Sequence, residues 1–330
     1  MNKKYLKLNK LYKLTYIFTF LFIFLIKSAC AKALSNINFS TVGPNTEPET
    51  AVIEDLDYLK TIGKEHSEKY YAYYGTKVPD IYDFVYTDVT NLQHKMLINK
   101  SALYNDVIWN RKERAKNKYS PLNYNISYGV DVSKHNGNIN WKKVKDAGLE
   151  FAFIRIVYRG YGKNGTLLQD ELAVENLKNA KAAGLKIGAY IFSQSLDDKE
   201  TLEEAELAIQ MLNDNNITLD LPLVYDPETI RSDIARTDYT TGETFTNNAI
   251  TFCEYVKSKG FTPAIYSNMI WQDYYFDMAK LKDYNIWYAD YEDFPQTPYR
   301  YTYWQFSERG KVSGITDDGG YVDLNIMIKR

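Results

Sequence analysis

Short apolar runs alternate with amphipathic segments from residue 126 onward. Eight of the runs have the length and the aromatic and β-branched content of strands, and they are Ser127–Val132, Phe151–Val157, Lys186–Phe192, Leu221–Tyr225, Thr262–Tyr266, Asn285–Ala289, Tyr301–Phe306 and Tyr321–Leu324. Four segments carry apolar residues at helical spacing, and they are Trp141–Ala147, Glu171–Ala183, Lys199–Leu212 and Phe245–Ser258. This alternation predicts βα units and parallel strands.

Helices are expected only in the first part of this region, because the last three strands follow one another without a helix between them. Gly148, Gly184 and Gly260 each close a helix just before the next strand, as glycines do at helix C-termini. The pattern predicts an α/β fold over residues 126–330. We expect an irregular (β/α) barrel of eight strands, with helices mainly between the first five strands and with an N-terminal helical extension.

Residues 1–33 have the features of a secretory signal. Five lysines precede the apolar run Tyr16–Ile26, which is shorter than the roughly 20 residues of a membrane span. Ala29-Cys30-Ala31 and Ala31-Lys32-Ala33 both offer a small-x-small cleavage pattern. The alternatives are lipidation at Cys30 and an uncleaved anchor. We therefore expect a secreted or envelope-associated protein that meets a membrane only through this segment.

Two further regions precede the barrel. Residues 34–50 are rich in Ser, Thr, Asn and Pro, which is typical of a flexible tether. Residues 51–120 are polar with weak helical periodicity, in which Leu97, Leu103 and Val107 could share one face. We expect a small helical region or stalk there.

Composition and charge narrow the class of protein. Forty-five per cent of the residues are apolar and 25% are charged, which is ordinary globular usage and excludes collagen and low-complexity disorder. The chain has 40 basic and 42 acidic residues; residues 1–33 hold seven lysines and no acid, so removing them leaves 33 against 42, a net charge of −9. A protein this acidic is a poor nucleic-acid binder. We expect a monomer.

No metal or cofactor is expected. The three histidines, His66, His94 and His135, are far apart in sequence and belong to no ligand cluster. Cys253 stands among apolar residues of a helical segment, where a buried thiol is the favoured interpretation.

Carboxylates recur at the ends of the predicted strands. Asp131 ends the first strand, Asp226 and Glu228 follow the fourth, Asp290 follows the sixth, and Asp323 lies in the eighth. Active sites of β/α barrels lie at the C-terminal ends of the strands. Each acid alone could be a cap, a turn residue or an ion-pair partner, but together they predict an acidic cleft.

Asp226-Pro227-Glu228 is the most informative tripeptide. Residues i and i+2 of an extended chain point to the same side, and Pro227 biases Asp226 toward extended geometry. Two nearby carboxylates cannot both ionise easily, so one pKa rises, and such an acid can protonate a glycosidic oxygen. The competing interpretation is a turn or helix entry.

Aromatic residues fall near the same strand ends. Tyr190, Tyr266, Trp287 and Trp304 could each be packing residues, but beside carboxylates they also fit a saccharide groove. Arg155 lies inside the second strand, where it must face a carboxylate or water, and we expect it to give structural or electrostatic support.

The same residues carry a resemblance to glycoside hydrolase family 25, the lysozyme-type muramidases. The matching stretches follow the order of the family, and they are Tyr128–Ser133 with His135, Gly137, Ile139 and Trp141, Phe153–Arg155, Asp170 with Asn176 and Ala180, Ala183–Tyr190, Asp226 with Glu228, Ile265–Asn268, Ile286–Ala289, Trp304–Ser307, Gly314-Ile315 and Val322–Asn325. Pro227 departs from the family, in which many relatives carry an aliphatic residue there. Lys134, beside Asp131, stands at a place that varies in the family and could pair with an acid.

The resemblance implies metal-free cleavage of the β-1,4 bond between N-acetylmuramic acid and N-acetylglucosamine in peptidoglycan. It implies that Glu228 is the general acid, that Asp226 is its partner carboxylate and holds the acetamido group of the substrate, and that Asp131 and Asp323 complete the cleft. The implied substrate-binding residues are Tyr190, Tyr266, Trp287, Trp304 and Gln305. Two alternatives remain at this point: a catalytically silent wall-binding module, and a barrel hydrolase acting on another polysaccharide.

Overall fold

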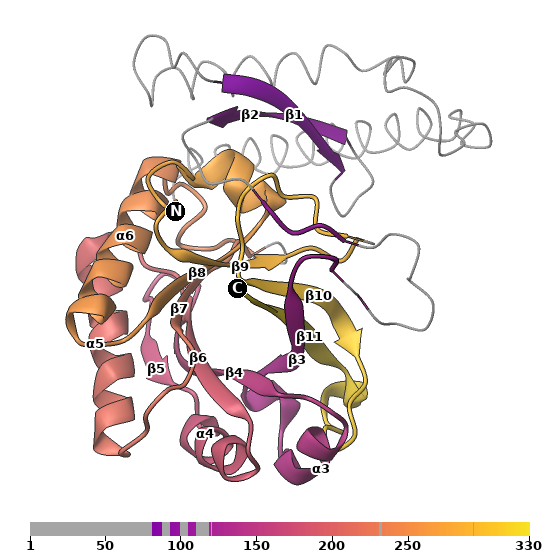
Figure 1. Ribbon diagram of the computed structural model, residues 1–330. Coiled ribbons are helices and arrows are strands. Elements are labelled where there is room, and N and C mark those ends of the chain that lie inside the picture. The colour runs from indigo at the N-terminus through magenta and orange to yellow at the C-terminus, as the bar shows by residue number, and fades with distance from the viewer. Residues whose placement is uncertain are drawn as a thin grey trace, which may run out of the picture. The chain divides into compact units, whose positions relative to one another are not determined.

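The computed structural model describes residues 81–87, 93–99, 105–109, 119 and 121–330, apart from residues 231, 232 and 293. Eight strands form a closed barrel, and they are β3 (Asn125–Val132), β4 (Phe151–Arg159), β6 (Lys186–Ser193), β7 (Leu223–Pro227), β8 (Pro263–Asn268), β9 (Asn285–Ala289), β10 (Tyr303–Gly310) and β11 (Val322–Lys329). Pairing of β3 with β4 closes the ring (Figure 1). The predicted barrel of eight strands is confirmed.

One strand of the barrel runs against the others. β11 pairs antiparallel with both β10 and β3, whereas the remaining neighbours in the ring pair parallel. A β-hairpin-like connection from β10 replaces a crossover helix at this point. The N-terminal end of β11 consequently lies at the same mouth of the barrel as the C-terminal ends of the other strands.

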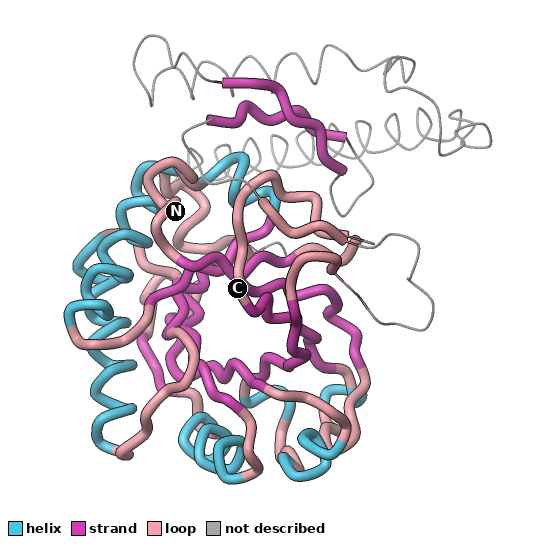
Figure 2. Tube along the Cα trace, in the orientation of Figure 1, coloured by secondary structure: helices cyan, strands magenta, loops and turns pink. Residues whose placement is uncertain are grey.

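Helices lie outside the ring of strands, as Figure 2 shows in cyan. The α-helices of the described residues are α3 (Trp141–Asp146), α4 (Ala173–Ala182), α5 (Asp198–Asp214) and α6 (Gly242–Ser258). Asp197 and Thr241 begin the two longest of these, because each side chain accepts a hydrogen bond from the backbone N–H three residues later. Each predicted helix is present with ends shifted by a few residues.

Several short elements were not predicted from the sequence. β5 (Leu167–Gln169) pairs antiparallel with β4, and a π-helical turn, η4 (Trp271–Tyr275), follows β8. Two single 3₁₀ turns, η3 (Lys134–Asn136) and η5 (Asp318–Gly320), lie after β3 and before β11. Elements of three to five residues have too little periodicity to be recognised in sequence.

The barrel has an inner and an outer apolar layer. Alternate residues of each strand point inward, and Phe151, Phe153 and Tyr303 fill the interior below the mouth. Gly129 makes room for this filling, since a Cβ atom there would lie 2.6 Å from the Phe151 ring. The outward residues pack under the helices, where Tyr225 of β7 contacts Phe252 of α6.

The described part of residues 51–120 contradicts the expected helical region. Residues 81–87 and 93–99 form two antiparallel strands, β1 (Ile81–Thr87) and β2 (Gln93–Asn99), with Phe84 opposite Met96. The sequence IYDFVYT of β1 is rich in the aromatic and β-branched residues that favour strands, and this outweighs the weak helical spacing. Leu97, expected on a helical face, lies in β2.

The signal-like segment 1–33, the tether 34–50 and the remainder of 51–120 lie mostly outside the described residues. Val107 is described, and it lies in a segment without regular secondary structure and has a buried side chain. None of the described helices is long and apolar enough to cross a membrane.

Candidate active site

Four carboxylates from three strands meet at one mouth of the barrel. Asp131 is the penultimate residue of β3, Asp226 is the penultimate residue of β7 with Glu228 directly after that strand, and Asp323 is the second residue of β11. Because β11 is antiparallel, its second residue faces the end of β3, and Asp323 pairs in register with Asp131. The structure therefore brings together the four acids that the sequence analysis selected.

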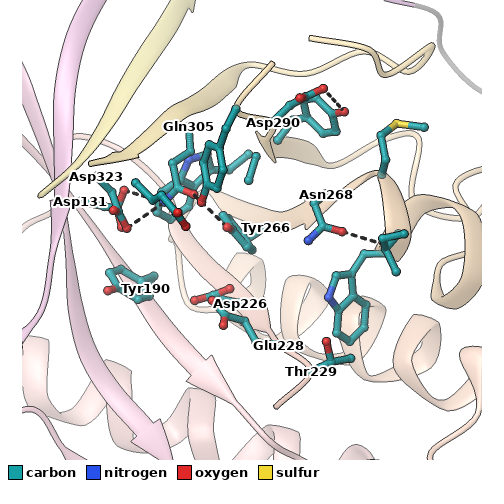
Figure 3. Close-up of a pocket in the computed structure, with 18 of the residues that line it drawn as sticks. Asp131, Tyr190, Asp226, Glu228, Thr229, Tyr266, Asn268, Asp290, Gln305 and Asp323 are labelled. Atoms are coloured by element: carbon teal, nitrogen blue, oxygen red, sulfur yellow. Dashed lines mark hydrogen bonds between the residues drawn. The ribbon is translucent and has the colours of Figure 1, made fainter. Parts of the chain in front are cut away.

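These acids line a cavity of about 1010 Å³. Figure 3 shows Asp131, Asp323 and Gln305 as one group and Asp226 and Glu228 as another. The wall also includes Arg155, side chains that follow β7 and β8, and aromatic residues. Apart from Arg155 and Gln305, the residues that complete the wall are Tyr190, Phe192, Thr229, Ile230, Tyr266, Asn268, Met269, Ile270, Trp271, Trp287, Tyr288, Ala289, Asp290, Tyr291, Glu292, Gln296 and Glu308.

Asp131 is held by two amide side chains. Nδ2 of Asn325 donates to its Oδ2 at 2.7 Å, and Nε2 of Gln305 donates to the same oxygen at 2.9 Å. Nε2 of Gln305 also lies 3.4 Å from Oδ2 of Asp323. Gln305 and Asn325 are register partners on β10 and β11, which places both amides beside the two acids.

Asp226 has an unsatisfied oxygen. Asp226 lies near the C-terminal end of β7, and it is 4% exposed. Its Oδ1 atom has no hydrogen-bond partner among the described residues. Glu228 follows beyond Pro227 and is half-buried, nearer the opening. Gln194 anchors this chain segment, because its Nε2 donates to the Glu228 carbonyl at 2.6 Å and its Oε1 accepts from Thr237.

Burial raises the pKa of all four carboxyl groups. The pKa of Asp131 rises to about 6 although amide hydrogen bonds oppose the rise, and that of Asp323 rises to about 9 because burial and the charge of Asp131 act together. The pKa of Glu228 rises to about 7 through burial and then through Asp131. Burial, followed by Glu228 and Asp131, raises the pKa of Asp226 well above its usual range. The cavity thus retains protons at neutral pH.

Arg155 is the cation of the cavity wall. Its Nη2 and Nε lie 2.8 and 3.0 Å from Oδ2 of Asp170, and the two side chains are 12% and 0% exposed. Its charge opposes the rise in the pKa of both Asp226 and Glu228. The expected electrostatic supporting role of Arg155 agrees with this arrangement. Lys134 instead pairs with Glu171 and contacts the Tyr158 ring, so it forms no ion pair with Asp131.

Asp290 orders the rim after β9. Its Oδ2 accepts from the Tyr288 hydroxyl at 2.7 Å and from the Gln296 backbone at 2.9 Å, and its Oδ1 accepts from the Glu292 backbone. A carboxylate used in this way shapes the loop and has little capacity left for substrate.

The structure separates the predicted aromatic residues into two sets. Tyr190, Tyr266 and Trp287 line the cavity, and each points inward from its strand. Trp304 is fully buried in the outer layer, where its ring contacts Trp109 and its Nε1 donates to the Asp290 carbonyl. The prediction that Trp304 binds substrate is therefore wrong, because successive residues of β10 face opposite sides and only its neighbour Gln305 faces the cavity.

Comparison with known proteins agrees with the barrel fold. The model of the family described as glycosyl hydrolases family 25 matches residues 130–315, more than half of the chain. The chain belongs to this family. The matched range contains Asp131, Asp226 and Glu228, and Asp323 lies just beyond it.

Two curated relatives are lysozymes. The chain is 26% identical over 201 residues to the autolytic lysozyme of Clostridium acetobutylicum, covering 60% of this chain and 54% of that protein. It is 28% identical over 203 residues to lysozyme M1 of Streptomyces globisporus, covering 60% of this chain and 66% of that protein. The chain thus spans about half the length of the first relative and two thirds of the second.

Solved structures share the fold. The modular autolysin LytC from Streptococcus pneumoniae, solved with a synthetic peptidoglycan ligand, superposes with a TM-score of 0.52 at 20% identity over 75% of this chain and 57% of that chain. The spore cortex lytic enzyme SleM from Clostridium perfringens gives 0.51 at 22% identity, over 61% and 67%. At these identities the likeness establishes the barrel architecture of this family member.

Sequence reasoning missed two residues of this candidate site. Asn325 was noticed only as part of the resemblance, although its position two residues after Asp323 on one strand puts both side chains on the same face. Tyr291 lies in the segment after β9, where no periodicity indicates its direction, and its hydroxyl donates to Oε1 of Gln305 at 2.9 Å.

The two remaining candidates for chemistry are a metal site and the thiol of Cys253. No group of three or more His, Cys, Asp and Glu side chains among them could hold a metal ion. Cys253 is fully buried in α6, and burial raises the pKa of its thiol well above the usual value. A thiol in this state is a poor nucleophile, in line with the packing role expected for it.

Proposed function

We propose that this chain hydrolyses the β-1,4 bond between N-acetylmuramic acid and N-acetylglucosamine in peptidoglycan. The proposal rests on membership of family 25, on the two lysozyme relatives and on the four carboxylates in one cavity. Glu228 is the general acid, and Asp226 is the residue that holds the acetamido group of the reacting sugar.

The unsatisfied Oδ1 atom of Asp226 is the observation that carries the proposal. A buried acceptor without a donor costs free energy, and such atoms are rare in folded proteins. The acetamido group of an N-acetylated sugar supplies one N–H, which is the donor that this atom lacks. A neutral hexose without an N-acetyl group could offer only hydroxyl donors and no adjoining carbonyl.

Substrate binding also determines which residue of the Asp226–Glu228 pair carries the proton. A hydrogen bond from the acetamide N–H favours the ionised form of Asp226. The proton then stays on Glu228, whose pKa of about 7 suits an acid working near neutral pH. Glu228 also lies nearer the opening of the cavity, where a glycan strand would pass.

The reaction then follows in two steps. Glu228 donates its proton to the glycosidic oxygen, the bond from the anomeric carbon to that oxygen breaks, and the acetamido carbonyl oxygen bonds to the anomeric carbon. Asp226 stabilises the positive charge that develops on the acetamido nitrogen. Water then attacks the anomeric carbon, the bond to the acetamido oxygen breaks, and Glu228 takes up a proton from the water. The carboxyl group is restored and no metal is required.

Sugar binding is assigned to the aromatic wall. Tyr190 and Tyr266 line the cavity together with the acids, and Trp287 forms the floor between them through edge-to-face contacts. Aromatic side chains combine apolar faces with polar tips, which matches the surface of a pyranose ring.

The deciding experiment is a digest of purified peptidoglycan with the full chain. We expect a fall in turbidity and new reducing ends on muramic acid, identified after borohydride reduction by mass spectrometry. Glu228→Gln should lower the rate about 10²–10⁴-fold while the folded state is retained. Reducing ends on glucosamine only, cleavage of chitin in preference to peptidoglycan, or wall binding without any hydrolysis would each overturn the proposal.

We also propose that the protein acts outside the cytoplasm, as the signal-like residues 1–33 indicate. Mass spectrometry of the mature N-terminus in an expressing bacterium tests this. A new terminus at Lys32 or Leu34 supports cleavage, and a diacylglyceryl group on Cys30 supports lipidation. An intact Met1 in a cytosolic fraction would contradict the proposal.

A further inference from the structure

Gln305 has no polar group left for a substrate. Its Oε1 accepts hydrogen bonds from the hydroxyls of Tyr266 at 3.0 Å and Tyr291 at 2.9 Å. Its Nε2 faces Oδ2 of Asp131 at 2.9 Å and Oδ2 of Asp323 at 3.4 Å. An amide offers two N–H donors and one oxygen with two lone pairs, so all four positions are used within the protein. This differs from the substrate-binding role that the family resemblance implied.

Aromatic donors fix the direction of both amides beside Asp131. The indole Nε1 of Trp287 can only donate, and it lies 2.8 Å from Oδ1 of Asn325, so Nδ2 of Asn325 must face Asp131. The hydroxyls of Tyr266 and Tyr291 donate to Oε1 of Gln305, which leaves its Nε2 facing Asp131. Oδ2 of Asp131 therefore accepts two N–H hydrogen bonds. Three aromatic side chains, Trp287, Tyr266 and Tyr291, orient the two amides that donate them.

This arrangement decides which carboxyl group of the Asp131–Asp323 pair is charged. Asp131 and Asp323 are register partners, and Nε2 of Gln305 lies within hydrogen-bond distance of Oδ2 of both, so it is unfavourable for both acids to be ionised at once. Two amide donors favour the ionised form of Asp131, and Asp323, with only the longer contact to Gln305, keeps the proton. Asp131 and Glu228 line the same cavity, and the negative charge of Asp131 adds to burial in raising the pKa of Glu228.

We infer that Gln305 is a positioning residue for the proton of the general acid. Held by Tyr266 and Tyr291, its amide keeps the negative charge on Asp131, and that charge keeps Glu228 protonated. The inference rests on the proposed function, because it takes Glu228 as the general acid.

Other charged and titratable groups face the same cavity and must stay constant in a test. These are Asp226 from β7, Arg155 from β4, Tyr190 from β6, Asp290 and Glu292 from the segment after β9, and Glu308 from β10. None of them forms a hydrogen bond with the Gln305 side-chain amide among the described residues, so substitutions at Gln305 and its two tyrosines leave them in place.

The test is the pH profile of kcat/KM on peptidoglycan for Gln305→Met and for the double variant Tyr266→Phe/Tyr291→Phe. Losing the amide donor raises the pKa of Asp131, weakens its charge near neutral pH, and so lowers the pKa of Glu228. We expect the basic limb to move to lower pH by about half a unit or more in Gln305→Met. The double variant should move the basic limb in the same direction by a smaller amount, because the Gln305 amide is still present and can donate to Asp131 in part of the molecules.

Tyr303→Phe is the matched control. It removes a phenol oxygen from the same barrel interior, lies below the cavity and forms no hydrogen bond with Gln305 in the described part of the chain. Its basic limb should coincide with that of the wild type. Unmoved basic limbs in both test variants would overturn the inference, even if kcat falls, since loss of rate alone fits a structural role.

A titration followed by ¹³C NMR of labelled glutamate carboxyls separates this inference from the proposed function. The Glu228 signal is assigned by its absence in Glu228→Gln. A lower Glu228 titration midpoint in Gln305→Met supports the inference even if the wild type fails to release muramic-acid ends, and an unchanged midpoint overturns it. If Gln305→Met does not fold, the double tyrosine variant decides by the same criterion.

Discussion

Asp323 lies directly across from Asp131 on the adjoining antiparallel strand, and Nε2 of Gln305 lies within hydrogen-bond distance of Oδ2 of both residues. A residue at the start of β11 reaches the catalytic mouth only because this strand alone runs against the other seven of the barrel. The reversed strand therefore contributes to the site at its N-terminal end, whereas every parallel strand contributes at its C-terminal end.

Asp323→Asn should stabilise the protein at alkaline pH. The folded-state pKa of about 9 is far above the ordinary value, so the stability cost of Asp323 is absent below about pH 4, grows as pH rises and is complete above about pH 9. Asparagine keeps the shape and an N–H donor toward Asp131 without the titration. Melting temperatures at pH 5 and pH 8.5 measure this, and we expect a larger gain at pH 8.5.

Asp323 is half-exposed, so solvent screening reduces the size of this gain. Asp317→Asn, on the exposed segment before β11, provides a control that should show the same melting temperature as the wild type at both pH values. An equal gain for Asp323→Asn at both pH values would show that the titration of Asp323 has no part in stability.

Arg155→Met should shift the pH profile in the direction opposite to Gln305→Met. Arg155 lowers the pKa of Glu228, so removing its charge raises that pKa and moves the basic limb of kcat/KM to higher pH. The variant also leaves Asp170 buried without its ion-pair partner, which costs about 3–5 kcal/mol of folding free energy. Denaturant unfolding and the pH profile check the two effects separately.

Arg155→Lys serves as the comparison, because it keeps the charge but loses the two-point contact with Asp170. It should leave the basic limb near the wild-type position while still lowering stability. A basic limb that moves equally in Met and Lys variants would mean that the charge of Arg155 is not what acts on Glu228.

The barrel was predictable because its strands and helices are long enough to show periodicity. The strand from Asn285 to Ala289 has the predicted bounds, and Gly184, with a φ of 86°, follows a helix as expected. The direction of β11 was not predictable, since alternation of apolar and polar residues is the same in parallel and antiparallel strands. The β1–β2 hairpin was missed because a few apolar residues at helical spacing were given more weight than β-branched and aromatic content.

The acids were predictable, but their hydrogen-bond partners were not. Asp131, Asp226 and Glu228 stand at strand ends, where the fold class alone places an active site. Gln305 was selected for the correct place but with the wrong role, because Tyr266 and Tyr291, which occupy its oxygen, are distant from it in sequence and only the fold brings them together. Residues in irregular segments, such as Tyr291, follow no period from which a direction could be derived.

Asp226→Asn should raise the melting temperature of the protein and lower its kcat. The variant removes a buried carboxyl whose ionised form is penalised by burial and by Glu228, so we expect a higher melting temperature at pH 7 to 8 than in the wild type. It also removes the negative charge that stabilises the acetamido nitrogen, so kcat should fall about 10²-fold or more. Both measurements use the same preparation, and a fall in melting temperature together with full activity would contradict the role assigned to Asp226.

Trp304→Phe should lower stability without affecting sugar binding. The indole is fully buried, contacts Trp109 and Tyr119 by edge-to-face geometry, and donates a hydrogen bond to the Asp290 carbonyl at 2.8 Å. Loss of this donor and of ring volume should cost about 1–3 kcal/mol in denaturant unfolding. KM for peptidoglycan should stay at the wild-type value, because Trp304 faces the outer layer of the barrel. Trp287→Phe, which alters the cavity floor and frees the Asn325 amide, should instead change kcat/KM. If the two variants changed KM alike, the division between inward and outward residues of β9 and β10 would not describe how the protein binds its glycan.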